Sequence, residues 1–254
     1  MNSCTKPSSK KHHITTIDDL IAHIEKGFVK QEAGSKKYND DIDIDLSDCY
    51  IDLYDEDKKP ISFSFYDFIG KVDYVQEPDT QSITSTSRIY HVIVTKRIVC
   101  FNSFIRTIWF SSTIFQKDVK LSNTTIEGGD MGSSRWNGEL YINSCTLKDC
   151  GRFSFSNFNR DLIIQSSTFD GLHLDFQSSI FKKRCILSFL TINKQVQREN
   201  FIRFTNSKFY NDFFIKSVET PCNLLLNDIH INGKIEVINF NIQNNNKSPN
   251  NYVI

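Results

Sequence analysis

Apolar residues recur along most of this chain at alternating intervals of five and six residues. The best-preserved stretch, residues 109–181, repeats one phrase: an apolar residue, a small polar residue, two more mostly small residues, a free position and a second apolar residue. Copies of this phrase begin at Phe110, Leu121, Ile142, Ile164 and Phe176. The spacing matches neither the period of a helix nor the two-residue period of a long strand. It is typical of a chain that turns a corner after each short straight segment.

The same register extends well beyond this stretch. The first apolar residues of successive copies are Val99, Phe110, Leu121, Met131, Ile142, Phe153, Ile164, Phe176, Leu187, Phe204, Ile215, Leu226 and Val237. They are 10 to 12 residues apart, except for one gap of 17 that holds a polar insertion at residues 194–200. A second apolar residue follows five places later in every copy but one, where Thr220 stands. The position two places before it is mostly Ser, Thr, Asn or Cys.

This register predicts an all-β fold built as a parallel β-helix, or β-solenoid. Two copies give a 22-residue coil with four apolar anchors, hence a four-sided coil. Because no coil can bury its anchors alone, neighbouring coils must stack, and about seven coils are expected. Backbone groups then pair between coils at about 4.8 Å, as in a parallel sheet. An antiparallel β-sandwich would explain the turns, but neither the fixed register nor the column of small residues.

The flanking segments suggest how the chain is divided. Residues 1–13 look like a disordered tail, residues 14–41 a helix and linker, residues 42–242 the solenoid with a loop insertion at 70–88, and residues 243–254 a flexible tail. Ile14 to Lys26 has the apolar spacing of one helical face, Thr15 or Thr16 can cap it, and Gly27 can end it. A helix this short is not stable alone, so we expect it to cap the N-terminal end of the solenoid. Earlier copies of the phrase are read at Leu46–Ile51 and Phe63–Phe68.

Charge and cysteine content narrow the setting. Lys plus Arg equals Asp plus Glu, 30 against 30, so we expect no direct binding to nucleic acid. The seven Cys residues form no CxxC pair and their number is odd, which favours reduced thiols. The first residues lack the apolar run of a signal peptide, and no window approaches 18 apolar residues. These features predict a cytoplasmic protein that does not bind a membrane.

One column of acidic residues is the strongest candidate for a surface with a function. The residue eight places past alternate first anchors is Asp118, Glu139, Asp161, Arg184 and Asp212. Acids in successive coils would lie about 5 Å apart, close enough to bind a cation or to present a line of negative charge. The plainer interpretation is a row of solvated turn residues. We predict no catalytic, cofactor-binding or metal-binding residues, because none of the six His has partners at zinc spacing and no carboxylate pair has an adjacent base. Cys49 and Cys145 match the small inward column and are expected in the core.

The repeat resembles that of the pentapeptide-repeat proteins over residues 42–242. The resemblance rests on Leu, Phe or Ile as the central residue and on Ser, Thr, Cys or Asn two places before it, as in Ser167-Thr168-Phe169 and Thr113-Ile114-Phe115. The chain departs from the family in three ways: the Ala-Asp/Asn-Leu form is nearly absent, Phe replaces Leu, and every second segment carries an extra residue. The resemblance implies a right-handed quadrilateral β-helix and a bacterial origin.

These observations favour a non-enzymatic protein whose rigid solenoid is a scaffold for a protein partner that the sequence does not identify. The first alternative comes from the resemblance, because one branch of that family mimics DNA and modulates type II topoisomerases or other DNA-binding proteins. It needs a strongly acidic face. The second alternative is a β-helix enzyme acting on polysaccharides. The partner is expected at the loops 70–88 or 194–200, since function concentrates in loops on rigid scaffolds. An uncapped C-terminal solenoid end could also pair with its twin in a homodimer.

Overall fold

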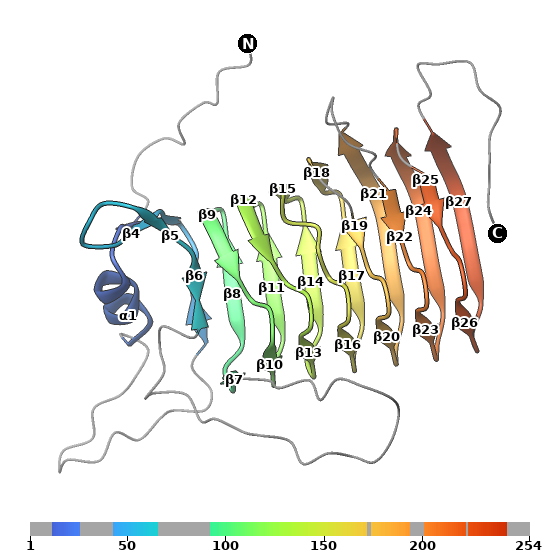
Figure 1. The fold of residues 1–254 in the computed structure, drawn as a ribbon, viewed down its shortest axis with the longest axis horizontal. Coiled ribbons are helices and arrows are strands. Elements are labelled where there is room, and N and C mark those ends of the chain that lie inside the picture. Colours follow the sequence, from blue (N-terminus) through green and yellow to red (C-terminus); the bar gives the residue numbers. More distant parts are fainter. Residues whose placement is uncertain are drawn as a thin grey trace.

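The chain folds into a rod of stacked coils, with α1 (Ile17–Glu25) at one end and β27 (Ile235–Ile242) at the other (Figure 1). The computed structural model describes residues 12–25, 43–65, 92–171, 174–193, 201–221 and 223–242. Within these ranges, strand pairing is parallel except between β4 (Leu53–Tyr54) and β5 (Pro60–Ile61). Successive coils repeat about every 22 residues, which confirms the predicted all-β solenoid.

Each coil has four sides, which we number as faces 1 to 4 in chain order. Face 1 comprises β2 (Ile44–Asp45), β8 (Ile98–Phe101), β11 (Val119–Ser122), β14 (Leu140–Asn143), β17 (Leu162–Gln165) and the first parts of β21 (Cys185–Asn193), β24 (Phe213–Thr220) and β27. Face 2 comprises β1 (His12–Ile14), β3 (Cys49–Ile51), the first parts of β9 (Phe104–Trp109) and β12 (Thr125–Asp130), β15 (Thr146–Lys148), β18 (Thr168–Asp170) and the second parts of β21, β24 and β27.

The remaining two faces complete the coil. Face 3 comprises β6 (Phe63–Ser64), the second parts of β9 and β12, β19 (Leu174–Asp175), β22 (Phe201–Arg203) and β25 (Asn223–Leu225). Face 4 is a seven-stranded sheet of β7 (Val92–Val94), β10 (Thr113–Phe115), β13 (Arg135–Trp136), β16 (Asn157–Phe158), β20 (Ile180–Phe181), β23 (Lys208–Phe209) and β26 (His230–Ile231). The first and last of its strands are therefore separated by about six turns of the solenoid.

Two opposite corners of the coil are made by residues with left-handed backbone conformation. Between faces 1 and 2 these residues are Asp48, Asn102, Asn123, Ser144, Ser166, Phe189, Ser217 and Asn239, and between faces 3 and 4 they are Ser112, Ser133, Phe155, Ser178, Asn206 and Asp228. Their φ angles lie between 49° and 59°. Asn and Asp tolerate this conformation better than most residues. The corner therefore explains one of the polar positions in the repeated phrase.

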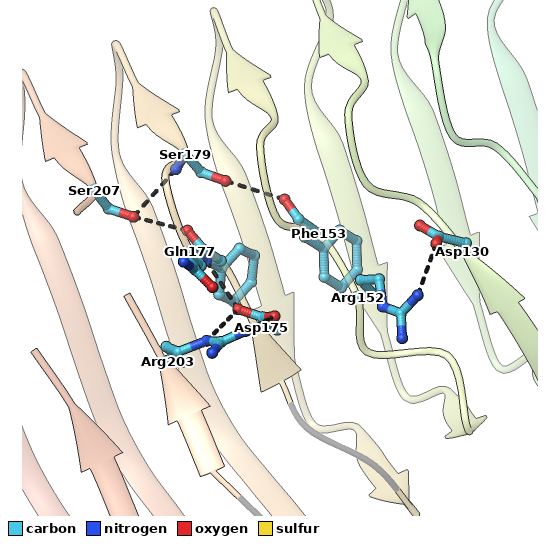
Figure 2. A network of polar contacts seen from close by, with 9 residues as sticks. Asp130, Arg152, Phe153, Asp175, Gln177, Ser179, Arg203 and Ser207 are labelled. Atoms are coloured by element: carbon cyan, nitrogen blue, oxygen red, sulfur yellow. Dashed lines mark hydrogen bonds and ion pairs between the residues drawn. The ribbon is translucent and has the colours of Figure 1, made fainter. Parts of the chain in front are cut away.

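The next residue in the phrase points inward, and its hydroxyl replaces strand hydrogen bonds at the corner. The Ser179 hydroxyl donates to the carbonyl of Phe153 (3.0 Å) and accepts the backbone N–H of Ser156 (3.1 Å). Ser207 does the same one coil further on, donating to Phe176 (2.7 Å) and accepting from the N–H of Ser179 (3.2 Å) (Figure 2). Small residues are therefore required here for hydrogen bonding as well as for space.

Aromatic side chains form continuous columns inside the rod. On face 4, Phe115, Trp136, Phe158, Phe181 and Phe209 stack with ring planes within 10° of parallel and centroids 4.2–6.2 Å apart. These rings come from consecutive coils, and all of them are buried. Because the coil spacing matches the distance of aromatic stacking, Phe can replace smaller anchors without breaking the register.

The predicted register is wrong by one residue at Val99. Leu121 pairs with Cys100 and Ile126 pairs with Ile105, so Cys100 and Ile105 are the inward residues of this coil. Val99 points outward, and Phe104 is only half-buried. Four apolar residues in a row, Ile98–Phe101, hide the alternation of the strand. Thr220 does lie in the anchor column of face 2, where it is buried and pairs with Ile242 of β27.

The phrase at Phe63 is also displaced from its predicted position. Phe63 pairs with Ile108 and Ser64 with Trp109, so Phe65 takes the place that Phe110 takes in the next coil. Residues 66–68 lie outside the described ranges. Phe63 and Phe65 are both buried, and their rings are 5.2 Å apart. Phe65, predicted as a filler between the anchors Phe63 and Phe68, is thus itself an inward residue.

The N-terminal end of the rod is covered as expected, but with a shorter helix. The side chain of Thr16 accepts the backbone N–H of Asp19 (3.1 Å), and Leu20 is fully buried in the core. His12 and His13, expected in a disordered tail, instead belong to β1 and pair with Cys49 and Tyr50 of β3. A strand forms here because β3 would otherwise leave an unpaired edge on this side.

The inner residues of the last described coil are less protected than those of the middle coils. Within the described ranges, β27 pairs only with β24, and Ile235 and Val237 remain more than 40% exposed. The equivalent residues one coil earlier, Phe213 and Ile215, are fully buried. Among the described residues, this end therefore presents a backbone edge together with apolar side chains.

We expect Ser179→Ala to destabilise the rod by about 1–3 kcal/mol, because it leaves a buried N–H and a buried carbonyl without their shared hydroxyl. Ser179→Thr retains the hydroxyl and has a precedent at Thr113 and Thr124 of the same kind of corner, so it should lose much less. Urea unfolding of the three proteins measures the difference. Equal stability of the Ala and Thr variants would show that only space matters at this position.

Candidate interaction surfaces

The predicted acidic column lies at the corner between faces 4 and 1. Its members stand in successive coils and are joined through backbone groups. One carboxylate oxygen of Asp118 accepts the backbone N–H of Glu139 (2.9 Å), Asp161 accepts that of Arg184 (3.0 Å), and Asp212 accepts that of Lys234 (2.9 Å). These carboxylates therefore hold one coil to the next at a corner where strand pairing is interrupted.

The surroundings of this column carry charges of both signs. An open groove of about 680 Å³ runs beside it, lined by Gln116, Lys117, Asp118, Asn137, Gly138, Glu139, Arg160, Asp161, Lys183, Arg184 and Asn211. Arg184 donates from Nε to the second oxygen of Asp161 (3.1 Å), and this hydrogen bond together with the negative charge raises the pKa of the guanidinium. The groove thus alternates cations and carboxylates along the rod.

Face 3 carries a second set of charges, arranged as two stacked ion pairs (Figure 2). Arg152 forms an ion pair with Asp130 (3.3 Å). Arg203 donates two hydrogen bonds to the carboxylate of Asp175, one of them from Nε to Oδ1 at 3.0 Å. The carboxylate of Asp175 is buried and also accepts the backbone N–H of Gln177 (2.9 Å). The hydrogen bond from Arg203 to Asp175 raises the pKa of this arginine. In each pair the arginine is one coil after the aspartate, so the pairs tie neighbouring coils together.

Face 1 presents an apolar stripe on its outer surface, defined here as Tyr141, Ile163, Ile186 and Phe214. These four side chains come from consecutive coils and are directly paired along the rod. All are half-buried by their neighbours and point away from the core residues on either side of them. Lys120 precedes the stripe and Glu236 follows it in the same column. Four aligned apolar side chains on a flat sheet form a candidate contact surface.

An exposed aromatic residue lies at the corner beside this stripe. Phe189 is 58% exposed and has a φ of 53°, whereas the same corner holds Asn or Ser in most other coils. The left-handed conformation costs a residue other than Gly, Asn or Asp about 1–2 kcal/mol. Phe189 is thus both strained and exposed, and such positions cluster at functional sites.

The described cysteines are buried inside the rod. They are Cys49, Cys100, Cys145, Cys150 and Cys185. Burial raises the pKa of Cys145 to about 11 and raises the pKa of Cys150 and Cys185 as well. The raised pKa values keep these thiols protonated at neutral pH, which makes them poor nucleophiles and poor metal ligands.

Metal-ligand clusters and membrane-spanning helices are both absent from the described part of the chain. In the ranges that the structure describes, no group of three or more His, Cys, Asp or Glu side chains is placed to hold a metal ion. None of the helices in those ranges has the length and apolar character needed to cross a membrane.

No protein-family model, no curated protein and no solved structure matches this chain. The surfaces of this solenoid must therefore be judged from their own geometry and chemistry.

The sequence did not single out the apolar stripe, although a signal for it was present. Its members stand immediately before the first anchors Ile142, Ile164, Leu187 and Ile215. Examination of that position in alternate copies would have revealed an apolar run at an outward position. The loops at 70–88 and 194–200, which were expected to bind a partner, lie outside the described residues.

We predict that the buried thiols resist modification while the chain is folded. In a variant with Cys4→Ser and Cys222→Ser, a disulfide reagent such as DTNB at pH 8 should label none of the five remaining thiols until denaturant is added. Burial and the raised pKa of Cys145 both suppress the thiolate that reacts. The absorbance of released thionitrobenzoate measures labelling. Rapid labelling of the native variant would contradict the buried, protonated state.

We also predict that Phe189→Asn stabilises the isolated chain by about 1 kcal/mol, since Asn accepts the left-handed conformation more readily. Phe101→Asn is the matched control, because Phe101 is 52% exposed on a neighbouring position but its φ is not left-handed. Thermal and urea unfolding measure both changes. An equal response of the two variants would mean that exposure rather than backbone strain sets the effect.

Proposed function

We propose that this protein is a non-enzymatic scaffold that binds a protein partner through the apolar stripe of face 1. The observation that carries the proposal is the unbroken alignment of Tyr141, Ile163, Ile186 and Phe214 on the outer surface. Contiguous apolar patches on a folded surface mark interaction sites. The strained and exposed Phe189 adds a second apolar contact at the edge of the same face.

The rigidity of the rod supports a scaffold role. The side chains that could otherwise act on a substrate are engaged between coils: Asp161 with Arg184, and Asp175 with Arg203. A surface whose positions are fixed by such contacts loses little conformational entropy on binding. The partner therefore meets a preformed template with one outward residue of the stripe per coil.

The assignment of this solenoid to the pentapeptide-repeat family is part of the proposal. We infer a divergent pentapeptide-repeat solenoid, supported by the four-sided coil and by small residues such as Ser167 and Ser179 two places before the central anchor. A bacterial origin, a cytoplasmic location and a homodimer through the C-terminal solenoid end stay predictions. The exposed Ile235 and Val237 are the observation that favours such an end-to-end contact.

The two alternative functions also stay predictions. A DNA mimic requires a strongly acidic face, whereas Lys117, Arg160 and Lys183 line the groove beside the acidic column. A supercoiling assay with gyrase tests this alternative. A polysaccharide-active enzyme is tested with a panel of acidic polysaccharides, comparing the wild type with variants at Asp118 and Asp161.

The proposed scaffold is tested by affinity capture from extracts of the native host, with Ile163→Asp as the disrupting variant. The new carboxylate lies in the middle of the stripe and should abolish retention of the partner. Thr168→Asp is the matched control, because it places the same group outward on face 2 of the same coil. Quantitative mass spectrometry of the captured proteins measures retention.

Support requires proteins that are retained by the wild type and by Thr168→Asp but lost with Ile163→Asp. Equal retention by all three proteins would remove face 1 as the binding surface. Circular dichroism of each variant confirms that the solenoid remains folded.

A further inference from the structure

We propose that the partner of the apolar stripe is a second copy of this chain, packed face to face with the two rods antiparallel. The inference rests on the proposed function, since it names the occupant of the same face. It is carried by the order of side chains along the column that contains the stripe. From the N-terminal side this column begins with Asp45 and Val99 and then reads Lys120, Tyr141, Ile163, Ile186, Phe214 and Glu236; the last six form the proposed contact, and the first two extend past the end of the paired region.

This order is complementary to its own reverse. A two-fold axis lying in the interface, parallel to the strands and midway between Ile163 and Ile186, brings each member of the column opposite another. Ile163 then faces Ile186 of the partner subunit, and Tyr141 faces Phe214 of the partner subunit. Lys120 faces Glu236 of the partner subunit, so the ends pair opposite charges. An isologous dimer requires this kind of self-complementary patch.

The charges beside the column extend the match at both ends of the interface. Within one chain, Lys120 lies 3.8 Å from Asp118, and Lys234 lies 2.8 Å from Glu236. The same two-fold axis places Asp118 opposite Lys234 of the partner subunit. Each end therefore gathers four charges of alternating sign, an arrangement that favours one relative orientation over others.

Opposite charges also meet across the axis at the middle of the corner between faces 4 and 1. Asp161 and Arg184 form an ion pair within the chain, and the axis sets them opposite Arg184 of the partner subunit and Asp161 of the partner subunit. Between these clusters Glu139 falls opposite Asp212 of the partner subunit. This like-charged contact occurs twice by symmetry and lies at the corner, where solvent screens the repulsion.

The strained corner residue also finds a place in this arrangement. Phe189 belongs to the same coil as Ile186, and the axis sets it opposite Ser166 of the partner subunit. A small side chain leaves room for the ring there. Burial of an exposed Phe on association would offset the backbone strain at this corner.

The size of the patch sets the strength to expect. The column spans five coil spacings of about 4.8 Å, and three outward positions across the face span about 13 Å. A patch of roughly 300 Å² per subunit is well below the about 800 Å² per partner of a standard interface, so weak association with dissociation constants well above micromolar is expected. The dimer should therefore form and dissociate with concentration in the range that sedimentation measures.

Sedimentation equilibrium of the full chain over a wide concentration range tests the proposal first. The wild type should show a monomer–dimer equilibrium, and Ile163→Asp should be monomeric. Lys120→Glu alone should weaken the dimer about tenfold or more, because like charges then meet at each end. The double variant Lys120→Glu with Glu236→Lys should restore affinity, since opposite charges meet again. Thr168→Asp on face 2 should leave the equilibrium unchanged.

A crosslinking experiment fixes the orientation. With Lys120→Cys and Glu236→Cys in one chain, mild oxidation by diamide should give a disulfide-linked dimer on a non-reducing gel. Within one chain these positions are about 24 Å apart by the coil spacing, too far for an internal bridge. Each single variant is a control that should give little dimer. A parallel dimer would reverse this outcome, because each single variant would then crosslink to itself.

Two results would overturn the antiparallel dimer. One is a strictly monomeric wild type; the other is a dimer that survives Ile163→Asp but is lost with Val237→Asp, which would place the contact at the C-terminal end. If the wild type is monomeric and yet a captured partner is lost only with Ile163→Asp, the scaffold function stands and only the identity of the partner is wrong. If neither a dimer nor stripe-dependent capture is found, both proposals fail.

Discussion

The middle of the rod depends on hydroxyl groups that complete backbone hydrogen bonding, at most of the described corners between faces 3 and 4 and at several between faces 1 and 2. A left-handed residue turns the chain there, and the next N–H and a nearby carbonyl are buried without strand partners. Ser134 shows the solution: its hydroxyl donates to the carbonyl of Phe110 (2.6 Å) and accepts the N–H of Thr113 (3.4 Å). A buried polar group without a partner costs about 1–3 kcal/mol, so each of these hydroxyls stabilises the stack. The last coils use another solution between faces 1 and 2, where β21, β24 and β27 run through the corner and Leu190, Val218 and Phe240 take the inward position. The aromatic columns pack in register because these corners fix where every coil begins and ends.

The sequence was sufficient for the fold because inward positions are under strict physical constraint. Anchors such as Phe158 and Phe181 must stack, and the small residue before them must fit and bond at the corner. The predicted register failed where an adjacent apolar residue could fill the same inward position. Cys100 replaced Val99 as an anchor because the strand around it is apolar on both sides. The corner hydrogen bonds themselves could not be foreseen from spacing, which explained small residues by space alone.

Outward positions carry much weaker sequence signals. The acidic residues Asp118 and Asp161 stood out because charge in a regular column is conspicuous, and the structure gives them a role in joining coils. The apolar stripe was overlooked because Ile163 and Ile186 lie next to true anchors and blend into strands that are apolar on both sides. Only a register correct to the residue separates an outward Ile from an inward one, because a shift by one position exchanges the two faces of a strand.

A solenoid face has one further physical property that bears on association. Its outward residues repeat at the coil spacing, so two such faces are commensurate at every offset of one coil. Identical Ile residues could therefore slide past one another with little change in buried area. A unique register needs markers that break the repeat, and charges at Lys120 and Glu236 occur at the two ends of the stripe. A shift by one coil in one direction would set Lys120 against Phe214 of the partner subunit, and a shift in the other direction would set Glu236 against Tyr141 of the partner subunit. Either shift separates Lys120 from its counter-charge. Apolar burial can thus supply attraction along the whole stripe, while the terminal charges select the offset and the antiparallel direction.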